Sequence, residues 1–140
     1  MKKIILIFLS IAMCISMYAC GNSKKEIIAE KLELKSWTFK GFDIATFSFE
    51  NGMCTKKWYA YKGDLWHYDI IPDESYYGSY NISSFDGEKG EIFIAFGLKK
   101  KSNDYDYKPV EKVIQTRLYF TFKNNILRVF TDEEMTIELI

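Results

Sequence analysis

The residue best suited to catalysis in this 140-residue chain is its single histidine, His67. Asp69 follows two positions later. In a strand, these two side chains point to the same face, where the aspartate could orient the imidazole as a general base. No serine or cysteine stands in a sequence context that marks it as the nucleophile. A small hydrolase using His67 is therefore less favoured than two non-catalytic binding functions, and we predict that the protein is not an enzyme.

The sequence patterns of metal and cofactor sites are also missing. With one histidine, a zinc site would depend on carboxylates, and no ligand spacing indicates one. The oxygen-rich segment 103–107 lacks the glycine and the final glutamate of an EF-hand loop. Neither common glycine-rich phosphate loop occurs. Carboxylates such as Asp69, Asp73 and the run 132–134 stand at predicted turns, so we predict no metal and no cofactor.

The composition limits the kinds of partner. Basic and acidic side chains number 19 each, which leaves no electrostatic footprint for DNA or RNA, so we expect no nucleic-acid partner. The length suits one domain with one modest core. Aromatic residues make up 17% of the chain. Such rings either pack in the core or line a cavity or platform for a lipid, a carbohydrate or a protein.

The N-terminal residues read as an export signal that ends at a lipid-attachment site. Two lysines precede residues 4–19, which are uncharged and mostly apolar, and Ala19 precedes Cys20. This segment resembles the lipobox of bacterial lipoproteins, in which a cysteine after a small residue is acylated and becomes the new N-terminus. The resemblance implies lipidation of Cys20 and a membrane-anchored protein of the bacterial cell envelope, outside the cytoplasmic membrane or on the outer membrane. An uncleaved anchor or a simple secretory signal is the alternative.

Cysteine usage agrees with that interpretation. If Cys14 leaves with the leader and Cys20 is acylated, Cys54 is the one thiol that remains, and it cannot form an internal disulfide. A lone cysteine in a β segment is typical of a small buried hydrophobe, with a reactive thiol as the alternative.

Beyond residue 36 the chain reads as antiparallel strands. Apolar and polar residues alternate, and Asn51–Gly52 is the strongest short hairpin signal because both turn positions need positive φ. Pro72 predicts a further turn, and Asn124–Asn125 permits another. Eight or nine short strands joined in this way form a meander, which curls into a barrel or folds into two packed sheets.

The strand region follows two N-terminal segments. We predict a signal peptide over residues 1–19, a lipidated cysteine with a tether or short helix over 20–33, and a β domain over 34–140. The spacing of the apolar residues Ile27, Ile28, Ala29, Leu32 and Leu34 suits an amphipathic helix in the middle segment, and a flexible linker is nearly as compatible with it.

This pattern resembles the lipocalin-like domains of small bacterial lipoproteins. Such domains carry a tryptophan early in the first strand and often an arginine late in the chain that lies over it. Trp37 occupies the first-strand position, and Arg128 is the candidate partner, while Lys35 stands where the family has glycine. The resemblance implies an all-β, up-and-down barrel of about eight strands that binds a small apolar or amphipathic ligand, with Trp37 at its closed end.

A ligand in such a barrel would enter at the opposite mouth. Side chains with wide apolar faces and polar tips suit an amphipathic guest. The candidates are Trp58, Tyr61, Trp66, Tyr68 and Tyr80. The alternative function is a protein-binding envelope module, such as an assembly factor or an enzyme inhibitor, that has no small-molecule ligand.

Overall fold

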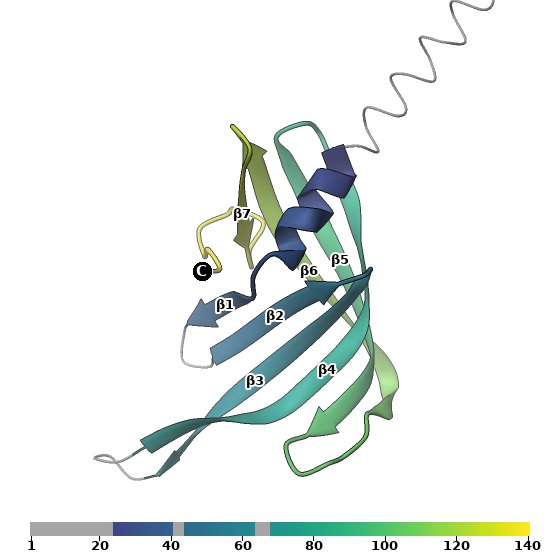
Figure 1. Cartoon of the computed structure of the whole chain (residues 1–140), viewed down its shortest axis with the longest axis vertical. Coiled ribbons are helices and arrows are strands. Elements are labelled where there is room, and N and C mark those ends of the chain that lie inside the picture. Colours follow the sequence, from purple (N-terminus) through teal and green to yellow (C-terminus); the bar gives the residue numbers. More distant parts are fainter. Residues whose placement is uncertain (1–23, 41–43, 64–67) are drawn as a thin grey trace, which may run out of the picture.

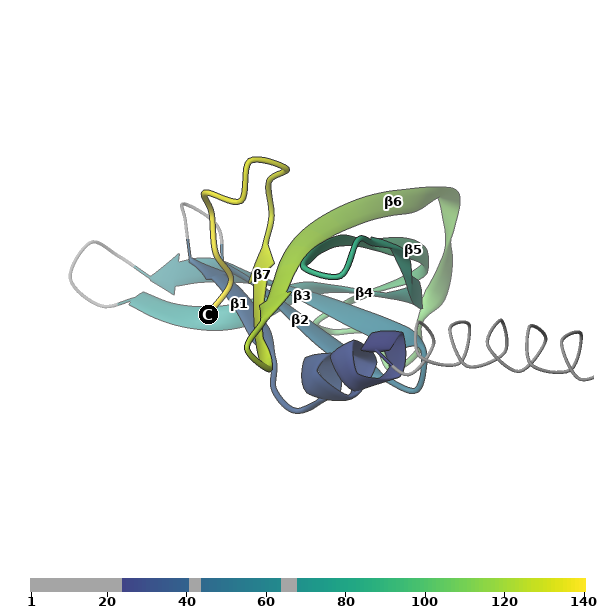
Figure 2. The ribbon, with the colours of Figure 1, turned by 90° about the horizontal axis from the view of Figure 1, so that it is seen from above.

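The computed structural model describes residues 24–40, 44–63 and 68–140. Seven antiparallel strands pair in chain order, from β1 to β7, and the sheet curls almost into a ring (Figures 1 and 2). Their bounds are β1 Trp37–Lys40, β2 Ile44–Glu50, β3 Met53–Gly63, β4 Tyr68–Phe85, β5 Lys89–Lys101, β6 Lys108–Lys123 and β7 Ile126–Phe130. The all-β, up-and-down barrel is confirmed, with seven strands in the described residues.

Two asparagine-containing turns hold the hairpins in register, as the sequence predicts. Asn51 and Gly52 have φ values of 49° and 77°, and Asn124 and Asn125 have 51° and 61°. Positive φ at both central positions is the signature of the tight turn that matches the twist of the flanking strands. These turns connect β2 to β3 and β6 to β7.

The turn predicted at Pro72 is wrong, because β4 runs straight through this residue. Pro72 pairs with Tyr59 and Glu74 pairs with Trp58, so one residue of β4 between them bulges out of the ladder. A bulge accommodates proline, which has no amide hydrogen to donate. The two strands predicted on either side of Pro72 are therefore a single strand, which lowers the strand count.

A helix over residues 24–33 precedes β1 and packs at the end of the barrel where β2 turns into β3 (Figure 1). Its Ile28 and Leu32 side chains have no exposed surface and belong to the core. The helix interpretation of this segment is therefore right, and the folded unit includes the helix. The part of the chain that the structure describes contains no helix with the length and hydropathy of a membrane span.

The core fills the end of the barrel next to the helix. The alternation of inward and outward residues places large buried apolar side chains inside on β1, β2, β5, β6 and β7. On β3 the buried residue is a cysteine, and the described part of β4 contributes the partly buried Tyr76, Tyr80, Ile82 and Phe85. The buried apolar residues are Ile28, Leu32, Trp37, Ala45, Phe47, Phe49, Cys54, Ile92, Ile94, Phe96, Leu118, Phe120, Val129, Phe130 and Leu139.

Residues 137–140 form a strap between the first and last strands, which we call the closing strap. Thr38 and Ile140 exchange two backbone hydrogen bonds, of 2.8 and 3.0 Å. On the other side, the Leu139 amide donates to the Val129 carbonyl of β7 at 2.8 Å. The ring of backbone hydrogen bonds is thus completed through this strap.

Acid is expected to loosen the closing strap before it affects the core. Arg128 donates two hydrogen bonds to the Glu138 carboxylate, at 2.8 and 2.6 Å, and these lower the pKa of Glu138. The Asp132 carboxylate accepts hydrogen bonds from the Thr136 hydroxyl and from backbone amides, which lower the pKa of Asp132. A carboxyl with a lowered folded-state pKa stabilises the fold above its unfolded pKa, and this contribution disappears as pH falls through the folded value.

Amide exchange measured by NMR from about pH 6 to about pH 3 checks this, because unfolded carboxyls titrate at about pH 4. Protection of the Leu139 and Ile140 amides is expected to fall relative to the β5 core amides as the pH drops. The Asp132→Asn variant should show a loosened strap already at neutral pH. Equal loss of protection in the strap and in β5 would contradict the prediction.

Candidate functional site

The structure spreads the predicted ligand-binding residues along the barrel. Tyr80 lies at the helix end, where its amide donates to the Gly52 carbonyl at 3.0 Å. Trp58 is on β3, six residues beyond Gly52 of the β2–β3 turn, roughly 20 Å away at the usual rise of a strand. Trp58 and Tyr80 therefore do not lie together. Tyr61 and Tyr68 are at the far end of the β3–β4 hairpin.

Other predicted residues lie outside what the structure describes. Cys20, Trp66 and His67 are not among the described residues, and neither are the side chains of Tyr61, Tyr68 and Asp69. The predictions made for them remain predictions.

Tyr80 contributes to the docking of the helix. Its ring meets the Phe49 ring edge-on, with centroids 4.8 Å apart. Its hydroxyl donates to the Glu33 carboxylate at 3.4 Å, and the Asn51 amide donates to the same carboxylate oxygen at 2.8 Å. Burial and the neighbouring Glu33 raise the pKa of Tyr80 to about 12. These contacts tie the end of the helix to the β2–β3 turn.

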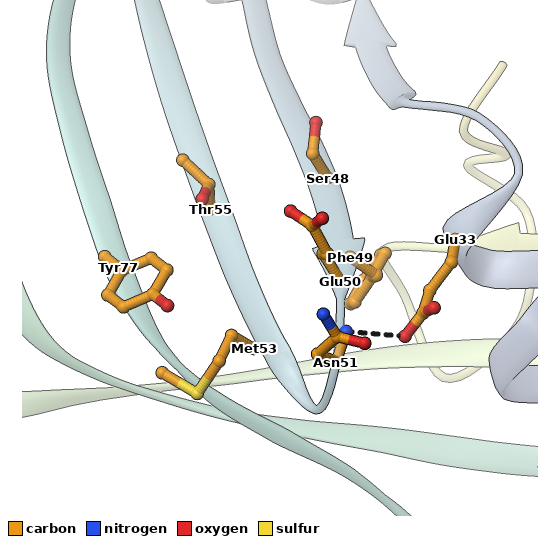
Figure 3. Close-up of a pocket in the computed structure, with 8 residues that line it drawn as sticks. All are labelled: Glu33, Ser48, Phe49, Glu50, Asn51, Met53, Thr55 and Tyr77. Carbon is orange, nitrogen blue, oxygen red and sulfur yellow. Dashed lines mark hydrogen bonds between the residues drawn. The ribbon is translucent and has the colours of Figure 1, made fainter.

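A pocket of about 380 Å³ lies beside this contact, at the end of the helix and over the outer face of β2, β3 and β4 (Figure 3). Its lining residues are Glu33, Ser48, Phe49, Glu50, Asn51, Met53, Thr55 and Tyr77. Figure 3 shows Glu33 turned toward the Asn51 amide. Of the two carboxylates that line the pocket, those of Glu33 and Glu50, the Glu33 carboxylate therefore already has a structural partner. Among the described residues, no group of three or more His, Cys, Asp or Glu could hold a metal ion.

Two larger pockets also lie outside the barrel. One, of about 400 Å³, lies at the β4–β5 hairpin, and Glu91 and Tyr119 help to line it. The other, of about 680 Å³, lies between β3, β4 and the β5–β6 loop, with Lys57, Lys100 and Tyr107 in its wall. All three hollows are lined mainly by side chains that point away from the core.

A different group of side chains faces the barrel interior, away from the helix. Antiparallel partners share a face of the sheet. The buried Phe47 is paired with Lys56, and Lys56 is paired in turn with Tyr76. The next row pairs Trp58 with Glu74. We call this group the inner-face cluster: Lys56, Trp58, Glu74 and Tyr76.

The Lys56 ammonium lies over two aromatic rings. Its Nζ atom is 4.2 Å from the centroid of the Trp58 ring and 5.4 Å from that of Phe47. Such contacts stabilise a cation that has lost part of its hydration. Burial lowers the pKa of Lys56. None of the ion pairs found among the described residues involves Lys56.

The acidic member of the cluster has a hydrogen-bond donor. The Tyr76 hydroxyl donates to the Glu74 carboxylate at 2.7 Å, and the Tyr76 ring packs at 6.1 Å from that of the buried Phe96. Burial, together with Glu74, raises the pKa of Tyr76 to about 12. The hydroxyl therefore keeps its proton at neutral pH and remains a donor.

The two halves of the inner face differ in their exposure. At the helix end, inward residues such as Ile92, Ile94 and Phe120 have no exposed surface. All four members of the inner-face cluster are only half-buried. The helix end is therefore filled, whereas the other half presents an amphipathic wall to solvent.

Sequence reasoning missed Lys56. Cys54, Lys56 and Trp58 alternate along β3, and the flanking residues face the core. A lysine at such a position is the signal that could have identified it, because strand alternation puts it on the apolar face.

The arginine predicted to cover Trp37 lies elsewhere. Arg128 binds Glu138 and stands 5.5 Å from the centroid of the Phe130 ring. The cation over Trp37 is Lys35, whose Nζ atom is 4.2 Å from the ring centroid. This prediction is wrong because the strap offers Arg128 a carboxylate of its own.

Cys54 is a small buried hydrophobe, as predicted. It has no exposed surface, and burial raises the pKa of its thiol to about 12. Since the thiolate is the reactive form, Cys54 is chemically inert in the folded protein.

No protein-family model, curated protein or solved structure matches this chain.

Proposed function

We propose that this protein is a non-catalytic lipoprotein of the bacterial cell envelope that binds a small amphipathic ligand at the inner-face cluster. Cys20 would carry the lipid anchor, and the barrel would carry the ligand. No nucleic acid and no cofactor takes part in this function.

One observation carries the proposal: the inner-face cluster remains half-exposed although its neighbours toward the helix are fully buried. A side chain that only filled the core would gain free energy by becoming fully buried. A wall of ring faces with an ammonium and a hydroxyl instead suits a guest with an apolar body and a polar head.

The anchor would hold the barrel in a defined orientation. Cys20 stands four residues before the start of the helix at Lys24. So short a connection spans roughly 14 Å at most. Acylation of Cys20 would therefore keep the helix end of the barrel close to the membrane.

A protein-binding module is the second candidate, and the loop between β5 and β6 supports it. Tyr105 in this loop is 99% exposed, and Val113 and Ile114 on β6 are 53% and 42% exposed. These exposed apolar side chains are available for contact with a protein partner.

Capture of the full chain from gently solubilised envelopes tests both candidates. We expect an acylated Cys20 at the N-terminus and one class of amphipathic lipid enriched with the protein. The Trp58→Ala variant should lower this enrichment about tenfold, which corresponds to a loss of about 1.4 kcal/mol.

Tyr105→Ala is the matched control, since it removes a fully exposed aromatic ring and should leave the lipid enrichment unchanged. An unmodified Cys20 would overturn the anchor. A stoichiometric protein partner without a lipid, lost in Tyr105→Ala, would favour the protein-binding module.

A further inference from the structure

We infer that the ligand of the inner-face cluster carries an anionic head group, and that Lys56 is the residue that receives it. This inference rests on the proposed function and adds the charge of the ligand. A fatty acid, with one carboxylate on an alkyl chain, represents the class.

The position of the Lys56 ammonium is the first argument. It faces the barrel interior, where its Nζ atom lies over the rings of Trp58 and Phe47. Ring faces replace only part of the hydration that an ammonium loses on burial. An anion bound beside Lys56 would supply the missing counter-charge and form a charge-assisted hydrogen bond.

The available carboxylate of the cluster does not neutralise Lys56. Glu74 lies one row further along β4 and accepts the hydrogen bond from Tyr76. Within the part of the chain that the structure describes, no ion pair joins Lys56 to Glu74. Among the residues that the structure describes, the ammonium therefore has no carboxylate partner.

The same two rows of the sheet continue to further lysines on β5. Lys99 is the partner of Tyr76, and Lys101 is the partner of Glu74. Counting both rows, three lysines stand against one glutamate. The field on this wall of the barrel is therefore positive, which attracts an anion and repels a cationic amphiphile.

Photo-crosslinking in intact cells that express the full chain tests the inference. The probes are a diazirine analogue of lauric acid and the matching analogue of lauryl alcohol, with labelling normalised to total membrane protein. We expect the acid to label wild-type β3 and β4 preferentially. Lys56→Met should lower the acid-to-alcohol ratio about tenfold, the effect of losing one charge-assisted contact.

Lys57→Met is the matched control, because Lys57 is the exposed next residue on the opposite face of β3. It should leave the ratio unchanged, and Lys56→Arg should preserve it. Protease resistance of each variant in the same cells reports whether the barrel has folded. The comparison of the acid and alcohol probes on the wild-type protein does not depend on any variant.

The outcomes separate the two proposals. Equal labelling of the wild-type protein by acid and alcohol would overturn the anionic head group and leave the amphipathic ligand in place. Equal loss in Lys56→Met and Lys57→Met would also overturn it, since general surface charge would then explain the preference. A folded protein that neither probe labels above background would overturn the proposed function itself.

Discussion

Replacing Gly78 with alanine is expected to destabilise the barrel by on the order of 3 kcal/mol, the upper range for overpacking a core. Gly78 lies opposite Cys54 on one side and Phe96 on the other, both of which are buried. A Cβ atom here would overlap the carbonyl oxygen of Ala95 and lie 2.7 Å from the Phe96 Cα atom. Backbone atoms cannot rotate away as a flexible side chain can, so two strands would have to separate.

Thermal unfolding of the full chain, followed by circular dichroism in a mild detergent, measures this effect. The loss corresponds to roughly 10 °C in Tm for a domain of this size. Gly97→Ala is the matched control, because a Cβ atom at Gly97 meets nothing within 4 Å. It should be neutral or slightly stabilising. Similar Tm values for both variants would show that β4 and β5 tolerate the wider spacing.

Replacing Trp37 with alanine is expected to cost about 3–5 kcal/mol, the range for removing a large aromatic side chain from a core. Trp37 is 4% exposed, and its Nε1–H group donates to the Leu32 carbonyl at 3.0 Å. This carbonyl is in the last turn of the helix, where it has no partner within the helix. The indole therefore fills the core and joins the helix to β1.

Trp37→Phe separates these two contributions. It keeps a ring in the core and removes the hydrogen bond, so about 1–2 kcal/mol is expected from urea unfolding. Trp58→Phe is the control, because Trp58 is half-buried and no hydrogen bond of its indole is found in the described part of the chain. An equal loss of stability in both variants would mean that the bond to Leu32 contributes little.

The elements that depend on local signals could be predicted from the sequence. The alternation of Phe47 and Phe49 with polar residues identifies the buried face of β2, and the Asn51–Gly52 turn pairs β2 with β3. Each of these signals involves residues that are close together in the sequence. The barrel follows from them because neighbouring strands joined by short turns pair in order.

The features that depend on distant pairing could not be predicted. Whether Pro72 ends a strand depends on whether β3 can oppose a bulge at that point. The separation of Trp58 from Tyr80 depends on the register of β3 and β4 over their whole length. Strand alternation could place Lys56 on the apolar face of β3, but its contact with the Phe47 ring depends on the pairing of β2 with β3.

The closing strap also protects the barrel from other copies of itself. An unpaired strand edge offers amide and carbonyl groups to any passing strand, and this is how sheets aggregate and exchange segments between chains. The strap occupies these groups at Thr38 on β1 and at Val129 on β7. The edges of β1 and β7 therefore have fewer free amide and carbonyl groups with which a strand of another molecule could pair. Where many copies are held at high density on one surface, this occupied seam keeps neighbouring barrels as separate molecules.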